Sequence, residues 1–396
     1  MAEAILTRRG GGELKIIGQT EEVVRFGEAI NKYSPILIRF AGTKLSDPSV
    51  LPAGSGRGVS FDPSGTYLAV AHDGSPYITI YKRNGDTFTK LPNPSVLPTG
   101  NGMGVTFDPS GTYLAVTHFF SPYITIYKRN GDTFTKLSNP SVLPTGNGMK
   151  VAFDPSGTYL AVTHFSSPYI TIYKRNGDTF TKLSNPSVLP ASDGRGVAFD
   201  PSGTYLAVTH VNSPYIIIYK RNGDTFTKLP DPSVLPASDG MGVAFDPSGT
   251  YLTVGHVNSP YITIYKRNGD TFTKLPNPSV LPAGNGFMAI FDPSGTYLAV
   301  AHVNSPYITI YKRNGDTFTK LPNPSVLPTG NGMEVAFDPS GMYLAVVYLN
   351  SPYITLYYGL LCFASNSEDW SISVKAGYAK ESGALGENKK VVILFR

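Results

Sequence analysis

The sequence predicts an all-β protein built from seven near-identical units, and three observations lead to this prediction. The pentapeptide Phe-Asp-Pro-Ser-Gly occurs seven times, and its aspartate recurs every 46 residues. Each unit holds four short runs of β-branched, aromatic and aliphatic residues, separated by turn formers. Among 396 residues there are 41 glycines and 33 prolines, and only 15% of residues are charged. This composition and the absence of helical periodicity exclude a helical bundle and a disordered chain.

One unit, Gly242–Pro278, shows how the strands are predicted. Asp246–Gly249 forms a type I turn, because proline suits the second turn position and glycine the fourth. Asn268–Gly269 forms a tight hairpin, because both residues tolerate positive φ. Four antiparallel strands, termed a to d, are therefore predicted at Val243–Phe245, Tyr251–Val254, Tyr261–Tyr265 and Thr271–Leu275.

Seven four-stranded units of this length predict a seven-bladed β-propeller. Strands b and c carry large side chains on both faces, as expected for blades packed between blades. Strand d occurs only six times within the repeats, and its missing copy lies near the N-terminus, where Thr43–Pro52 matches Thr89–Pro98. We therefore expect an N-terminal strand to close the ring and remove its open edges. Ser34–Ile38 resembles the start of strand c, which leaves open an eighth, hybrid blade completed by the C-terminal tail.

The sequence divides into an N-terminal non-repeat segment, residues 1–33, the propeller, residues 34–358, and a β-rich C-terminal tail, residues 359–396. Ile372–Val374 and Val391–Phe395 have the composition of strands. Because both ends of a closed propeller emerge near one blade, we expect the two flanks to pair as a small terminal β-module.

Divergence between the seven copies falls mainly on the b–c loops and the d–a connections, which share one end of the disc. The a–b and c–d turns at the other end hardly change. We expect the divergent end to bind a protein partner or a surface glycan. The candidate residues are Arg57, Asp73, Met103, Phe119, Phe120, Met149, Lys150, Phe165, Arg195, Met241, Phe287, Met333 and Glu334.

Within this set, Phe119, Phe120 and Phe165 are predicted to form an exposed apolar patch on two adjacent blades. The alternative is that the phenylalanines pack against neighbouring blades and that the methionines fill the channel. Arg57 and Glu334 lie on the first and last blades, which are neighbours across the closure, so a salt bridge between them is expected.

Other chemistries are not predicted. Six histidines recur at the end of strand b, too far apart for one metal ion, and we expect them to bond the loops. No cofactor and no catalytic residue is expected, because seven like groups around a ring do not form a converging site.

The net charge of +5 and the compensated Lys82–Arg83 pairs argue against nucleic-acid binding. The sequence has no apolar run of membrane-spanning length and no N-terminal signal peptide. We therefore expect that the protein is synthesised in the cytoplasm and that it does not insert into a membrane.

The runs Phe-Asp-Pro-Ser-Gly-Thr-Tyr-Leu-Ala-Val and Tyr-Ile-Thr-Ile-Tyr, at this strand spacing, make the chain resemble bacterial WD40-like seven-bladed propellers over about residues 43–357. The Trp-Asp dipeptide of that family is absent, and tyrosine and lysine end strand c. The near-identity of the blades resembles recently amplified propellers. Gly377–Gly383 and Lys389–Ile393 are similar to C-terminal segments of phage and prophage tail-associated proteins.

These resemblances imply a non-enzymatic binding or scaffold protein within a phage-tail-like particle or a cell-surface-recognition assembly. Two alternatives remain from other classes: a lectin that binds surface glycans, and a lactonase-like hydrolase.

Overall fold

The computed structural model describes residues 3–8, 13–15, 42–359 and 370–375. The chain separates into two compact units, and the larger one contains all described residues from 42 to 359. Within the described ranges no helix has the length and apolarity that crossing a membrane requires.

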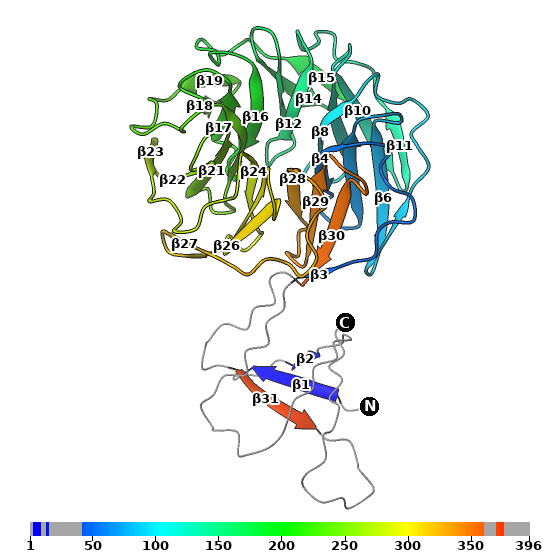
Figure 1. The fold of residues 1–396 in the computed structure, drawn as a ribbon. Coiled ribbons are helices and arrows are strands. Elements are labelled where there is room, and N and C mark those ends of the chain that lie inside the picture. The colour runs from blue at the N-terminus through cyan, green and yellow to red at the C-terminus, as the bar shows by residue number, and fades with distance from the viewer. Residues whose placement is uncertain (1–2, 9–12, 16–41, 360–369, 376–396) are drawn as a thin grey trace, which may run out of the picture. The chain divides into compact units, whose positions relative to one another are not determined.

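The larger unit is a β-propeller of seven four-stranded antiparallel sheets arranged around a central axis (Figure 1), which confirms the predicted fold class. Blades one to seven are numbered by their a strands, which lie innermost. The a strands are β4 (Gly56–Phe61), β8 (Gly102–Phe107), β12 (Gly148–Phe153), β16 (Gly194–Phe199), β20 (Gly240–Phe245), β24 (Gly286–Phe291) and β28 (Gly332–Phe337). The b strands are β5 (Tyr67–His72), β9 (Tyr113–His118), β13 (Tyr159–His164), β17 (Tyr205–His210), β21 (Tyr251–His256), β25 (Tyr297–His302) and β29 (Tyr343–Tyr348).

The c strands are β6 (Ile78–Asn84), β10 (Ile124–Asn130), β14 (Ile170–Asn176), β18 (Ile216–Asn222), β22 (Ile262–Asn268), β26 (Ile308–Asn314) and β30 (Ile354–Tyr358). The outer d strands are β7 (Thr87–Lys90), β11 (Thr133–Lys136), β15 (Thr179–Lys182), β19 (Thr225–Lys228), β23 (Thr271–Lys274), β27 (Thr317–Lys320) and β3 (Thr43–Lys44). The a strands begin three residues earlier than predicted in the repeat at Gly242–Pro278, because their glycine-rich start still pairs with strand b through a β-bulge.

Burial along the strands follows their place in the blade. Strand b is buried over its whole length in every blade, as β9 shows. Strand d alternates instead, and in β11 Phe134 is buried between exposed threonines. The difference arises because strand b has a blade on each face, whereas strand d forms the rim.

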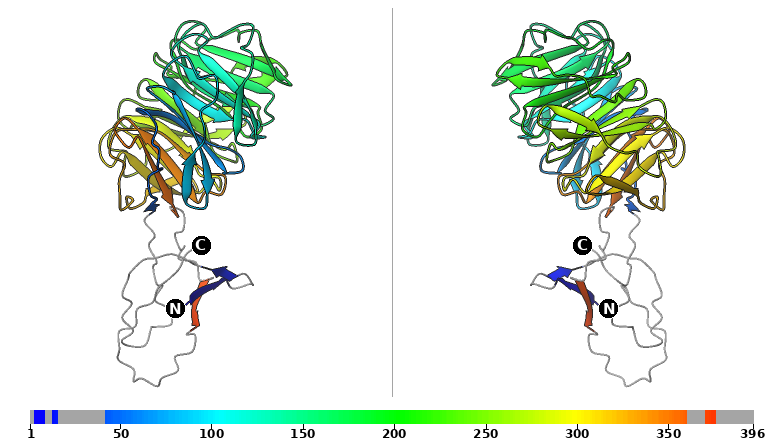
Figure 2. Two further views of the ribbon diagram at one scale, coloured as in Figure 1. Left: turned by 90° about the vertical axis from the view of Figure 1, so that its right-hand side faces the viewer. Right: turned by 90° about the vertical axis from the view of Figure 1, so that its left-hand side faces the viewer.

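The hydrophobic cores lie between successive blades. One core joins Tyr67 and Ile80 of blade one to Leu114 and Phe134 of blade two. Equivalent clusters recur around the ring, so each blade contributes one face to each of two cores. Figure 2 shows the ring of blades from two further sides. A single blade therefore cannot bury its apolar faces alone, and the closed ring is the cooperative unit.

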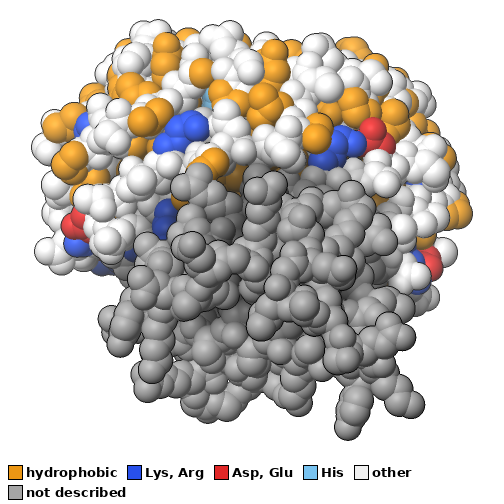
Figure 3. All heavy atoms as spheres, turned by 60° about the horizontal axis from the view of Figure 1, so that its bottom comes forward, with side chains coloured by type: hydrophobic (Ala, Val, Ile, Leu, Met, Phe, Trp, Pro, Cys, Tyr) orange, Lys and Arg blue, Asp and Glu red, His pale blue; other side chains and the backbone are white. Residues whose placement is uncertain are grey.

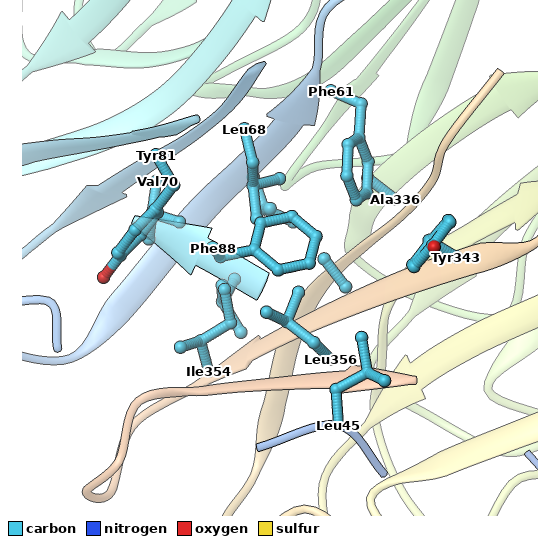
Figure 4. Close-up of a cluster of buried hydrophobic side chains, with 13 residues drawn as sticks. Leu45, Phe61, Leu68, Val70, Tyr81, Phe88, Ala336, Tyr343, Ile354 and Leu356 are labelled. Atoms are coloured by element: carbon cyan, nitrogen blue, oxygen red, sulfur yellow. The ribbon is translucent and has the colours of Figure 1, made fainter. Parts of the chain in front are cut away.

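The ring closes where β3 pairs with β30 in blade seven, which confirms the predicted N-terminal closing strand. The Leu45 amide donates to the Leu356 carbonyl at 2.8 Å, and the Leu45 side chain is buried. Figure 4 shows Leu45 with Leu356, Phe88 and Tyr343 in the core shared by blades seven and one. Ser34–Ile38, the basis of the hybrid-blade alternative, lie outside the described residues.

The a–b turn takes the predicted form and is held by its aspartate. In blade one, the Gly65 amide donates to the Asp62 carbonyl at 2.9 Å, and Gly65 has a φ of +68°. The Asp62 carboxylate accepts hydrogen bonds from the Tyr67 amide at 2.8 Å and the Ser64 hydroxyl at 2.7 Å. These bonds satisfy a carboxylate that is almost completely buried, which explains why every blade keeps aspartate here.

The smaller unit contains a three-stranded sheet in the order β2 (Glu13–Lys15), β1 (Glu3–Arg8), β31 (Trp370–Lys375). β1 pairs antiparallel with β31, with Ile5 opposite Ser373. A terminal β-module formed from both ends of the chain is thus confirmed, and β31 contains the predicted strand Ile372–Val374. Val391–Phe395 lie outside the described residues.

Candidate binding face

Each end of the propeller carries two of the four kinds of connection. In blade one, the connection that leads into strand a lies directly against the b–c loop. The two are so close that an ideal Cβ on Gly54 of the connection would lie 2.2 Å from the Asp73 carbonyl of the loop. The Arg83 Nε near the c–d turn donates to the Gly65 carbonyl of the a–b turn at 2.6 Å. We call the first end, with b–c loops and d–a connections, the loop face, and the other end the turn face.

The turn face is occupied by contacts between blades. The Tyr67 hydroxyl of blade one donates to Asp132 Oδ1 of blade two at 2.5 Å, and Lys82 Nζ lies 2.8 Å from Asp132 Oδ2. The Arg129 guanidinium of blade two covers the Tyr67 ring at 4.4 Å. The same contacts close the ring, where Tyr343 donates to Asp86 at 2.6 Å. These interblade contacts give a structural reason for the constancy of the turns.

The loop face carries a row of stacked side chains on three successive blades. The Phe119 and Phe165 rings pack edge to face, with centroids 6.3 Å apart and planes at 88°. The Arg195 guanidinium of blade four lies 4.8 Å from the centre of the Phe165 ring. We call these three residues the Phe–Phe–Arg row. Both phenylalanines are half-buried, so the rings also support each other, as the packing alternative anticipated.

Arg195 is held by this row rather than by an ion pair. Its buried Nε has no hydrogen-bond partner within the described part of the chain. Burial lowers the pKa of the Arg195 guanidinium, and the charges of Asp193 and Asp239 oppose that shift. The residue therefore combines a stacked apolar face with donor capacity that its own blade does not use.

Phe120 follows Phe119 of the row and is the most exposed large hydrophobic side chain of the described propeller, at 64%. An ideal Cβ on Gly100 would come 2.4 Å from the Phe120 ring, so glycine lets the ring lie against the backbone. Figure 3 shows hydrophobic side chains spread over the visible surface with charged groups between them. The other exposed large hydrophobic residues among residues 42–359 are one valine from each d–a connection: Val50, Val96, Val142, Val188, Val234, Val280 and Val326.

The charged candidates pair differently from the sequence-based expectation. Arg57 Nη2 lies 2.7 Å from Asp73 Oδ2 in its own blade, and Glu334 pairs with Lys150 of blade three. The expected Arg57–Glu334 bridge is therefore wrong. Arg57 lies at the β-bulge of strand a in blade one, where the register shifts between Gly56 and Gly58. Arg57 contacts its own b–c loop there, whereas Glu334 lines the central cavity.

The remaining candidates lie at the same end of the a strands. Met149 is buried, and the others are half-buried: Met103, Met241, Phe287 and Met333. Glu334 and Lys150 line a central cavity of about 340 Å³ bounded by all seven a strands. Burial raises the pKa of the Glu334 carboxyl, and the neighbouring Lys150 ammonium opposes this shift.

Five of the six strand-end histidines bond the carbonyls of their b–c loops, as predicted. In blade two, His118 Nδ1 lies 2.8 Å from the Phe120 carbonyl and Nε2 lies 3.0 Å from the Thr125 hydroxyl. Burial lowers the pKa of His118 to about 4. Within the described ranges, no cluster of three or more histidine, cysteine, aspartate or glutamate side chains could hold a metal ion.

Two features of the loop face were not predicted from the sequence. The first is the contact of Arg195 with Phe165, and the second is the pairing of Lys150 with Glu334 across the axis. A signal for both existed, because each of these residues departs from the consensus of its repeat position. An alignment of the repeats does not give the distance in space between divergent residues on different blades.

Comparison with known proteins adds support for the fold alone. No family model and no curated protein sequence matches the chain. Hydrazine synthase from Kuenenia stuttgartiensis is similar in structure, with a TM-score of 0.60 and 16% identity over 79% of this chain and 97% of that one. A candidate 6-phosphogluconolactonase from Bacteroides uniformis has a TM-score of 0.61 and 14% identity, over 83% of this chain and 97% of that one. The propeller fold is compatible with a binding or scaffold role, and the WD40-like and phage-tail resemblances stay predictions.

Proposed function

We propose that this protein is a non-enzymatic binding and scaffold module that contacts a protein partner through its loop face. The assembly that we infer is a phage-tail-like particle or a cell-surface-recognition complex, into which the terminal β-module would connect the disc. The observation that carries the proposal is the exposure of Phe120 beside the Phe–Phe–Arg row.

The asymmetry of the ring favours this location. The exposed valines occur once in each blade, so they mark no single site, whereas an aromatic pair in a b–c loop occurs only in blade two. Aromatic and arginine side chains contribute most of the binding energy in protein interfaces. The exposed Phe120 ring, beside a row that ends in a stacked arginine, is therefore the best candidate for an anchor on this surface.

The pairing of charged side chains favours a protein partner over the substrate of an enzyme. Two pairs of charged groups at this end of the disc neutralise each other, and the first pair is Arg57 with Asp73. Lys150 and Glu334 are likewise engaged with each other. A nucleophile or general base needs a free group beside a substrate-sized cleft, and the paired charges do not supply one.

The test compares Phe120→Ser with Val142→Ser, which removes another exposed apolar side chain, at 50%, from the PSVLP segment between blades two and three. A photoreactive phenylalanine analogue at position 120 should crosslink one discrete protein in an extract of the source cells, and the same analogue at position 142 should not. The purified partner should then bind the Phe120→Ser variant at least about tenfold more weakly than the Val142→Ser variant.

Three results would overturn the proposal. Equal partner binding by both serine variants would remove the loop face from the interface. Specific retention on a glycan array, lost in Phe120→Ser, would favour the lectin. Turnover of a lactone panel that disappears in Glu334→Gln would favour the hydrolase. Both serine variants should keep the melting temperature of the parent protein, because neither side chain is buried.

A further inference from the structure

Near the axis of the propeller, two blades carry a charged residue at a position of strand a where the other five carry an uncharged one. At the second variable position of strand a, four blades carry glycine and one carries Met288, whereas blade three carries Lys150 and blade seven carries Glu334. The Lys150 and Glu334 side chains are 24% and 14% exposed. They line the central cavity already described.

Three oxygens surround the Lys150 ammonium, and each comes from a different blade. Nζ donates to the Arg57 carbonyl of blade one at 2.8 Å and to the Met103 carbonyl of blade two at 3.2 Å. It also donates to Glu334 Oε2 of blade seven. A lysine ammonium has three N–H donors, so these three acceptors can satisfy it completely.

Two glycines allow the carbonyls to reach this place. Gly58 and Gly104 directly follow Arg57 and Met103. An ideal Cβ on Gly58 would lie 3.0 Å from the Gly104 Cα, and one on Gly104 would lie 2.8 Å from the Met149 carbonyl. Any larger residue would therefore force the strands apart. The close approach of strands β4, β8 and β12 brings the two carbonyls and the Lys150 stem together.

We propose that the Arg57 and Met103 carbonyls and the Glu334 carboxylate form an axial cation-binding site that takes a primary ammonium group, and that the protein occupies this site with its own Lys150. The ligand class that follows is a primary alkylammonium ion, and removal of the lysine side chain should open the site to such an ion from solution. This site is independent of the proposed partner-binding surface around Phe120.

The geometry distinguishes an ammonium from a metal ion. N–H···O bonds have donor–acceptor distances of about 2.7–3.2 Å, which the two carbonyls match. Calcium requires about six to eight oxygens at about 2.3–2.6 Å, and magnesium requires shorter bonds still. Two carbonyls at ammonium distance and one carboxylate do not meet these requirements. A mostly buried carboxylate such as that of Glu334 also needs an opposite charge beside it.

The test uses Lys150→Gly, which introduces the residue that four sister blades already carry. The probe is n-butylammonium chloride, which reproduces the deleted lysine side chain from Cβ to Nζ. Tetramethylammonium chloride at the same concentration is the control, because it has the same charge and number of carbons but no N–H donor. We expect n-butylammonium to raise the melting temperature of Lys150→Gly by about 1–3 °C at a concentration several times its dissociation constant.

The parent protein, with its site filled, should not respond to n-butylammonium beyond the tetramethylammonium effect. Lys150→Gly combined with Glu334→Gln should lose most of the response, because the carboxylate supplies the counter-charge. Lys150→Ala serves as a second opened variant in case the glycine variant is poorly folded. Equal effects of the two salts on both opened variants would overturn the proposal, as would failure of n-butylammonium to restore folding to variants that need it.

Discussion

In blade four, Ile217 occupies the position from which a threonine hydroxyl reaches the strand-end histidine of other blades. Nε2 of His210 is buried there, and within residues 42–359 it has no hydrogen-bond partner. In blade five, by contrast, His256 Nε2 lies 3.0 Å from the Thr263 hydroxyl. The chain therefore contains one blade with the histidine–threonine pair and one blade that lacks the threonine, in the same structural context.

The pair in blade five should contribute measurably to stability. Thr263→Val removes the hydroxyl but keeps the shape, and it leaves His256 Nε2 buried without its partner. We expect the free energy of unfolding to fall by about 1–3 kcal/mol, measured as a shift of the urea midpoint. In a His256→Phe background the same substitution should cost much less, because no imidazole remains to be satisfied. An equal cost in both backgrounds would show that the hydrogen bond contributes nothing.

The buried histidines should make the propeller sensitive to acid. Burial lowers the pKa of His118 and His164 to about 4, compared with an ordinary value near 6.5. Between these values the unfolded chain binds protons that the folded chain does not. Stability should therefore be fully present above about pH 6.5 and fall as the pH drops towards 4, by about 1.4 kcal/mol per pH unit for each such histidine.

This pH dependence can be checked with a substitution that the chain itself supplies. Tyr348 stands in the place of the histidine in blade seven, and its hydroxyl lies 2.8 Å from the Thr355 hydroxyl. His118→Tyr should therefore fold and show a shallower decline of the melting temperature between pH 6.5 and 4.5. A slope identical to that of the parent protein would exclude His118 as a source of acid sensitivity.

Two leucines provide a matched test of the ring closure. Leu45 and Leu91 each follow a Thr-Lys pair, and each amide donates to a c-strand carbonyl at 2.8 Å. Their exposures are 9% and 8%. Replacing either by alanine should cost about 2–5 kcal/mol of stability through lost burial and cavity formation.

Only Leu45→Ala should also open the ring locally. Leu91 follows β7, which a hairpin joins to β6, whereas β3 and β30 pair from opposite ends of the propeller sequence with no hairpin between them. We expect faster amide exchange and protease cleavage around residues 42–52 in Leu45→Ala than around residues 88–98 in Leu91→Ala. Equal exposure of the two segments would contradict the idea that the closing strand is the weakest point of the ring.

The sequence predicted most of the fold because the repeat supplies seven copies of the same local information. The Asp246–Gly249 turn and the Asn268–Gly269 hairpin follow from backbone preferences, and the match of Thr43–Pro52 to Thr89–Pro98 located the closing strand. The candidate site was less predictable. The expected Arg57–Glu334 bridge failed because Arg57 pairs with Asp73 of its own blade and Glu334 pairs with Lys150 of blade three.

What the sequence by itself determined is the number of blades, the order of their strands and the end of the disc at which the copies diverge. Only the tertiary structure decided which divergent residues meet. Lys150 and Glu334 are separated by 184 positions, with three blades between them along the chain, yet both line the axial cavity, where all seven a strands converge. Periodicity fixes which face of a strand a residue occupies, but the distance between two such residues depends on the curvature of the closed ring.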